Sequence, residues 1–144
     1  MQSSNRKIKY LIGIDEVGRG PLAGPVTLGA VMIRKAGAKN FSEIFRAVKD
    51  SKQLTEKKRE EWFEIAKRER DAGRIDFSVS SVENFMIDRI GLARAIRRAL
   101  QNCLKKLKAV PDECEVLLDG SLYAPKEFIN QKTIIKGDEK LKII

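Results

Sequence analysis

The stretch G-I-D-E-V-G-R-G-P, residues 13–21, ends an apolar run with two adjacent carboxylates, Asp15 and Glu16. Two glycines then frame a single arginine, which combines backbone freedom with one fixed cation suited to a phosphate or a sugar. Carboxylate oxygens are the ligands that hard divalent metals prefer. The stretch therefore predicts a metal-dependent site for nucleic acid, exposed at a turn after a strand.

Alternating apolar residues predict strands on both sides of this stretch. Residues 7–14 are typical of a central strand, because both faces are partly apolar, and residues 25–33 predict a second strand that returns antiparallel. Neighbouring side chains of a regular strand point to opposite faces. Asp15 and Glu16 can therefore reach one site only if the strand ends or bulges there, and the glycines and Pro21 supply such a break.

The rest of the chain alternates helical and strand patterns, which predicts an α/β fold: one domain over residues 1–144 with a mixed sheet flanked by helices. Thr55 is the expected N-cap of a helix that Gly73 ends, and Ser81 the expected cap of a short helix through Arg89. Further helices are expected at 41–48 and 92–107, and further strands at 74–80, 115–118 and 132–135.

The amino-acid composition favours some binding partners and excludes some types of catalytic site. The formal charge of +9 and the pI of about 9.7 favour polyanionic partners, above all nucleic acid. The chain contains no histidine, which excludes Ser-His-Asp catalysis and histidine-ligated zinc. Cys103 is expected in the core and Cys114 in a loop as a free thiol, which fits a reducing compartment. No apolar run reaches the length of a membrane span, and the polar N-terminus is unlike a signal peptide, so a cytoplasmic protein is expected.

The expected helix at 92–107 has one apolar face and one basic face. The basic face is either simply solvated or a stripe that contacts a nucleic-acid backbone. Its members are Arg94, Arg97, Arg98, Lys105 and Lys106.

Three of the expected strands end in carboxylates, namely Asp15 with Glu16, Asp119 and Asp138. Each is followed or flanked by glycine, and Asp119 or Asp138 taken alone could be an ordinary turn residue in Asp-Gly or Gly-Asp. Together they suggest convergence on one edge of the sheet. Four carboxylates can hold two Mg²⁺ or Mn²⁺ ions about 3.5–4 Å apart, the arrangement that hydrolyses phosphodiesters.

Four motifs resemble those of the ribonuclease HII family, in the family's order. The longest, G-I-D-E-V-G-R-G-P-L-A-G-P-V at residues 13–26, is highly specific; the others are D-S-K-Q-L-T at 50–55, L-L-D-G at 117–120 and K-G-D-E-K at 136–140. The resemblance implies a ribonuclease H-like fold and an endonuclease active in DNA replication and repair. Such an enzyme cleaves RNA in RNA/DNA hybrids and incises 5′ of single ribonucleotides in duplex DNA.

The resemblance also implies roles for individual residues. The metal-binding catalytic acids would be Asp15, Glu16, Asp119 and Asp138. The residues that meet the ribonucleotide and its phosphate would be Gly18, Arg19 and Gly20, with Lys52 and Lys136 as further phosphate contacts. A Mg²⁺ or Mn²⁺ pair is the implied cofactor, and a monomer is expected.

Where the family continues into an alanine- and serine-rich helix and then a tyrosine, this chain stops at Ile144. Neither Tyr10 nor Tyr123 matches that tyrosine. We therefore expect a C-terminally truncated form, with lower stability and weaker ribonucleotide discrimination. Two alternatives remain: a basic remnant that binds nucleic acid without cutting it, and another two-metal nuclease of the same fold, such as a junction resolvase. The Gly-Arg-Gly element favours the ribonuclease over the resolvase.

Overall fold

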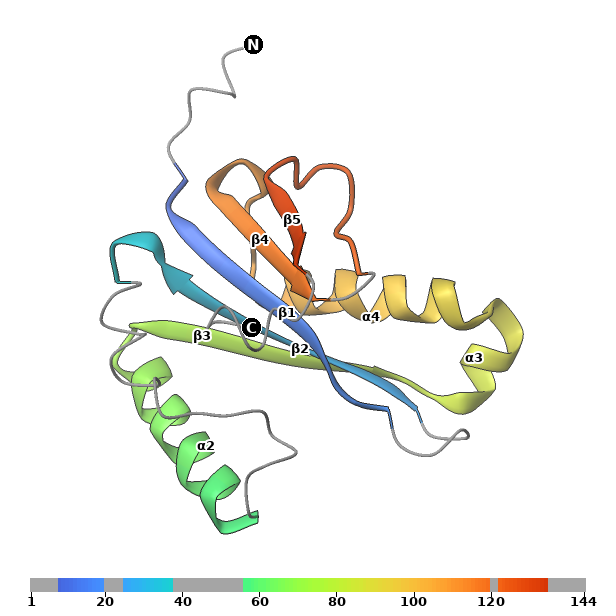
Figure 1. Cartoon of the computed structure of the whole chain (residues 1–144), viewed down its shortest axis with the longest axis horizontal. Helices are drawn as coiled ribbons and strands as arrows, with labels where there is room; N and C mark the ends of the chain where they lie inside the picture. The colour runs from blue at the N-terminus through green and yellow to red at the C-terminus, as the bar shows by residue number, and fades with distance from the viewer. Residues whose placement is uncertain (1–7, 20–24, 38–55, 120–121, 135–144) are drawn as a thin grey trace.

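The computed structural model describes residues 8–19, 25–37, 56–119 and 122–134, and Figure 1 shows the whole chain. A five-stranded sheet with the order β3-β2-β1-β4-β5 forms its centre. The strands are β1 (Tyr10–Arg19), β2 (Val26–Arg34), β3 (Ile75–Val82), β4 (Cys114–Asp119) and β5 (Gln131–Ile134). The helices are α2 (Glu56–Asp71), α3 (Asn84–Ile90) and α4 (Leu92–Lys106), with short 3₁₀ turns at η2 (Lys35–Gly37) and η4 (Pro111–Glu113).

The sheet is mixed, as predicted. Strand β2 pairs antiparallel with both β1 and β3, whereas β4 pairs parallel with β1 and with β5. Four strands, β1, β3, β4 and β5, therefore run in one direction, and their C-terminal ends lie at the same edge of the sheet. We call this the C-terminal edge. The segment after a strand that ends there is the natural place for functional side chains.

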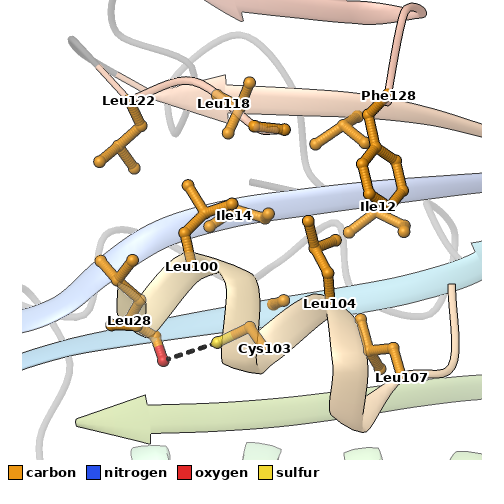
Figure 2. Packing of buried hydrophobic residues seen from close by; sticks show 14 of the residues in the cluster. Ile12, Ile14, Leu28, Leu100, Cys103, Leu104, Leu107, Leu118, Leu122 and Phe128 are labelled. Atoms are coloured by element: carbon orange, nitrogen blue, oxygen red, sulfur yellow. Dashed lines mark hydrogen bonds between the residues drawn. The ribbon is translucent and has the colours of Figure 1, made fainter. Parts of the chain in front are cut away.

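The main core lies between the sheet and α4 (Figure 2). Ile12 and Ile14 of β1 alternate onto this face and are fully buried, as is Leu118 of β4. Helix α4 contributes five buried residues, of which Ala99, Leu100, Cys103 and Leu104 follow from helical spacing in the sequence and Ala95 is added by the structure. Each fully buried Leu or Ile stabilises the fold by about 1.5–3 kcal/mol, so this face carries most of the hydrophobic stabilisation.

The opposite face of the sheet carries a smaller cluster beneath α2. Ile33 and Ile75 are its buried members, and Trp62 and Ile65 of α2 are only half-buried against them. Helix α2 ends as expected: Gly73 has φ 81°, a left-handed conformation that glycine adopts without strain, and its N–H donates to the Arg70 carbonyl at 2.9 Å.

Two predicted boundaries are wrong. Strand β1 runs to Arg19 rather than ending at Ile14, because its backbone keeps pairing with β2 as far as Arg19 opposite Val26. Ser81 lies inside β3 and caps no helix; its hydroxyl lies 2.7 Å from that of Thr27 on β2. Helix α3 starts at Asn84 after Glu83, whose side chain makes no capping hydrogen bond. The expected helix at 41–48 and the Thr55 cap lie outside the described residues.

Both cysteines are free and buried. The core position predicted for Cys103 is confirmed, and its thiol donates to the Leu28 carbonyl at 3.4 Å (Figure 2). The loop position predicted for Cys114 is wrong: η4 ends at Glu113, and Cys114 starts β4 opposite Tyr10. Burial raises the pKa of both thiols above the ordinary cysteine value, since the charged thiolate is poorly solvated there.

Candidate active site at the C-terminal edge of the sheet

Two of the predicted acids occupy equivalent positions on neighbouring parallel strands. The β1–β4 register runs from Tyr10 opposite Cys114 to Ile14 opposite Leu118. The next residue on each strand is an aspartate, Asp15 on β1 and Asp119 on β4. Because paired strands are about 4.8 Å apart, this register brings the backbones of the two aspartates side by side at the C-terminal edge.

The carboxylate of Asp15 is partly buried and accepts a hydrogen bond from the Glu16 N–H at 2.8 Å. Glu16 is also partly buried and is paired with Leu28 on β2. Because neighbouring residues of a strand alternate, the side chains of Asp15 and Glu16 leave the backbone on opposite faces of the sheet. The pairing register then shifts between Glu16 and Gly18. The irregularity that the two adjacent acids require is therefore present as a bulge one residue after them, although the strand itself continues.

Other predicted site residues are described in backbone only, or not at all. Gly18 and Arg19 pair with Thr27 and Val26 of β2, and Ile134 at the end of β5 pairs with Asp119. Strand β5 thus ends at the same edge as β4. The predicted site residues in the segments outside the described ranges are Gly20, Lys52, Lys136 and Asp138. Within the described ranges, no group of three or more His, Cys, Asp and Glu side chains is arranged to hold a metal ion.

A support that sequence reasoning missed ties the β4–β5 connection together. The side-chain amide of Gln131 accepts the Ala124 N–H at 2.8 Å and donates to the Phe128 carbonyl, also at 2.8 Å. The Thr133 hydroxyl donates to the Leu122 carbonyl at 2.9 Å. These bonds hold residues 122–128 of the β4–β5 connection against β5. No local pattern signals them, since a glutamine at a strand start is unremarkable until the loop folds around it.

The described helices include none that is both long and apolar enough to cross a lipid bilayer.

Comparison with known families gives one consistent answer. The family described as Ribonuclease HII matches residues 12–144 of this chain. A curated ribonuclease HII of Caldicellulosiruptor bescii is 41% identical over 136 residues, which cover 94% of this chain and 60% of that protein. A ribonuclease HII of Fusobacterium nucleatum is 40% identical, over 92% of this chain and 58% of that protein. The chain thus spans about three-fifths of the length of these relatives.

Solved structures support the same fold. The ribonuclease H2 of Pyrococcus horikoshii matches with a TM-score of 0.64 at 25% identity, over 93% of this chain and 66% of that one. A structure of Bst-RNase HIII in complex with Mn²⁺ matches with a TM-score of 0.56 at 20% identity, over 96% of this chain and 49% of that one. The second likeness concerns the fold alone. The predicted architecture of a mixed sheet flanked by helices is confirmed.

Proposed function

Because the chain belongs to the ribonuclease HII family, we propose that it is an endonuclease that hydrolyses the RNA strand of RNA/DNA hybrids and incises 5′ of ribonucleotides embedded in duplex DNA. The products would carry 3′-hydroxyl and 5′-phosphate ends. The observation that supports this activity best is the parallel β1–β4 register, which brings Asp15 and Asp119 to one edge of the sheet. Two acids from distant parts of the chain become neighbours there.

The residues that would hold the metal are Asp15, Glu16, Asp119 and Asp138. The donor set fits Mg²⁺ or Mn²⁺, because all four are carboxylates and the part-buried Asp15 is held by the Glu16 N–H. The Mn²⁺ complex of a protein with a similar fold is in keeping with this choice. A bound pair of such ions would supply an activated water and charge stabilisation for hydrolysis of the phosphodiester.

The residues that would select the substrate follow the acids directly. Gly18, Arg19 and Gly20 would meet the ribonucleotide, because glycines let the backbone approach closely and the guanidinium pairs with phosphate. Recognition of the 2′-hydroxyl is what separates RNA from DNA at a single position. Lys52 and Lys136 would add phosphate contacts as point charges.

A second candidate function is binding of nucleic acid without cleavage. Helix α4 favours it, since its exposed face is basic and its sequence contains no acidic residue. In this case the chain would hold duplexes in a salt-sensitive way and leave them intact.

One assay separates these functions. The protein is incubated with Mg²⁺ or Mn²⁺ and a DNA duplex that contains one internal ribonucleotide. We expect incision 5′ of the ribonucleotide and a loss of at least about 10³-fold in rate in Asp119→Asn, the scale on which catalytic groups act. The matched control is Asp71→Asn, an exposed aspartate at the end of α2, which should cleave normally.

Other outcomes would reassign the function. Salt-sensitive binding without incision would support the second candidate. Equal cutting of a duplex that contains no ribonucleotide would point instead to a different two-metal nuclease of this fold. Cleavage that survives in Asp119→Asn would remove the proposed acid from the site.

A further inference from the structure

The solvent-facing side of α4 contains a shallow depression of about 210 Å³. Three arginines and a glutamine of α4 line it, together with Ile90 at the end of α3: Arg94, Arg97, Arg98 and Gln101. All three arginines are exposed, on the side of the helix opposite the buried residues of the core. We call this feature the arginine depression. A concave surface lined by three guanidinium groups favours an anion.

These arginines have no acidic partners in the part of the chain that the structure describes. Helix α4 contains no acidic residue, and the ion pairs among the described residues leave Arg94, Arg97 and Arg98 out. Lys106, near the C-terminal end of the helix, donates its ammonium group to the neutral Val79 carbonyl at 2.6 Å. Three of the five positive charges of α4 therefore lie at the arginine depression.

A second depression, of about 540 Å³, provides an internal contrast. It is lined by Arg34 and Arg74 together with Glu69. There the guanidinium of Arg74 donates to both carboxylate oxygens of Glu69, at 2.6 and 3.0 Å. At this second depression Glu69 offsets one of the two arginines, whereas the three arginines of the arginine depression have no ion pair among the described residues.

The arginine depression lies toward the C-terminal edge of the sheet. Strand β3 runs parallel to β1 and leads into α3, and α4 begins after Gly91 (Figure 1). Arg94, Arg97 and Arg98 therefore belong to the end of α4 that starts from the edge where Asp15 and Asp119 lie. Arginines three and four residues apart on one helix face repel each other. A bound anion would relieve that repulsion.

We infer that the arginine depression binds phosphodiester groups of duplex nucleic acid, as a contact separate from the acidic residues of the C-terminal edge. The identity of the polyanion rests on the proposed function, whereas the anion site itself rests on three clustered guanidinium groups that have no acidic partner within the described ranges. Guanidinium forks match phosphate oxygens in geometry and remain charged at every physiological pH.

The test is the salt dependence of duplex binding, measured by fluorescence anisotropy in EDTA, with the variant Arg94→Gln/Arg97→Gln/Arg98→Gln. Glutamine has a helix propensity close to that of arginine, so α4 should remain folded, and circular dichroism checks this. Each lost phosphate contact lowers the slope of log K against log salt by about 0.9. We expect the slope to fall by about 2–3 and the affinity at 0.1 M salt to fall at least roughly tenfold.

The control variant removes the same charge near the opposite edge of the sheet, with glutamine at three exposed positions: Lys35, Arg68 and Lys126. It should change the slope by less than about 1, since distant exposed charges are screened. Equal loss in both variants would overturn the inference, because net charge alone would then explain binding. An unchanged slope in the arginine variant would overturn the inference as well. So would a variant that binds inorganic phosphate more weakly, at constant ionic strength, but binds the duplex as tightly as the wild-type protein does.

Cleavage under saturating protein distinguishes this inference from the proposed function. The arginine variant should keep the maximal rate of incision while losing affinity. If the wild-type protein does not cleave but the two slopes differ as expected, the anion site stands and the proposed nuclease function fails. If cleavage occurs and the slopes agree, the nuclease function stands and the arginine depression does not bind the duplex.

Discussion

Helices α2 and α4 cover opposite faces of one sheet and use their charges in different ways. Helix α2 carries six acidic and six basic residues, whereas α4 carries five basic residues and no acidic one. Helix α4 also buries five residues in the main core, while no described side chain of α2 is fully buried. Helix α2 thus has balanced charges and packs only half-buried side chains against the sheet. Helix α4 has a positively charged exposed face and packs fully buried side chains against the sheet.

The charges of α2 are neutralised within the helix and against its neighbours. Lys58 pairs with Glu61 and Lys67 with Glu64, at 3.5 and 3.0 Å. The Lys67 ammonium also lies over the ring of Phe63, 5.1 Å from its centroid. Such exposed pairs each contribute a few tenths of a kcal/mol and leave little net field. Helices α2 and α4 are both highly charged, but only α4 carries charge of a single sign.

The largest expected effect tests the difference in burial. Leu100→Ala in α4 should lower the free energy of unfolding by about 2–5 kcal/mol, because Leu100 is 1% exposed and leaves a cavity in the main core. Ile65→Ala in α2, at a half-buried position, should cost less than half as much. Urea melts measure both. Similar losses for the two variants would show that the two faces contribute equally to stability.

The next effect concerns the loop that completes the α4 side of the core. Leu122, Ala124 and Phe128 belong to that core, and the amide of Gln131 holds their backbone in place. Gln131→Ala should lower the free energy of unfolding by about 1–3 kcal/mol, because carbonyls and an N–H lose their partner. The control, Asn130→Ala, changes an exposed side chain and should stay within about 0.5 kcal/mol of wild type in the same urea melts. A neutral Gln131→Ala would mean that water replaces the amide without cost.

The smallest effect lies on the α2 side and depends on pH. The Arg74 guanidinium donates to Glu69 and lowers the pKa of that carboxyl below the ordinary value for a glutamate. The resulting stability is present above the unfolded-state pKa and is lost as pH falls through the lower folded-state value. Glu69→Gln should therefore cost less than about 1 kcal/mol at pH 7, as for other exposed ion pairs.

That difference between wild type and Glu69→Gln should disappear in strong acid, which urea melts at several pH values would reveal. A cost that persists unchanged at low pH would mean that hydrogen-bond geometry, and not charge, stabilises the pair.

Local patterns in the sequence predicted some elements well and others poorly. The burial of Ala99, Leu100 and Cys103 on one face of α4 follows from helical spacing alone and is confirmed. The prediction that the first strand ends at Ile14 is wrong. Pairing with β2 extends β1 to Arg19, through residues whose own sequence pattern does not predict a strand. The loop position predicted for Cys114 is wrong for the same reason, because Cys114 pairs with Tyr10, which lies far away in the sequence.

The sequence by itself determined the acids, the Gly-Arg-Gly element, the family and the one-signed charge of α4, because these depend on residue identity at short spacing. Only the tertiary structure decided that β4 lies beside β1 in a register that brings Asp15 next to Asp119. It also decided that Arg74 pairs with Glu69, while Arg94, Arg97 and Arg98 line one depression and have no ion pair with any residue that the structure describes. Strand register and ion pairing arise from contacts between distant segments, and short patterns along the chain carry no record of such contacts.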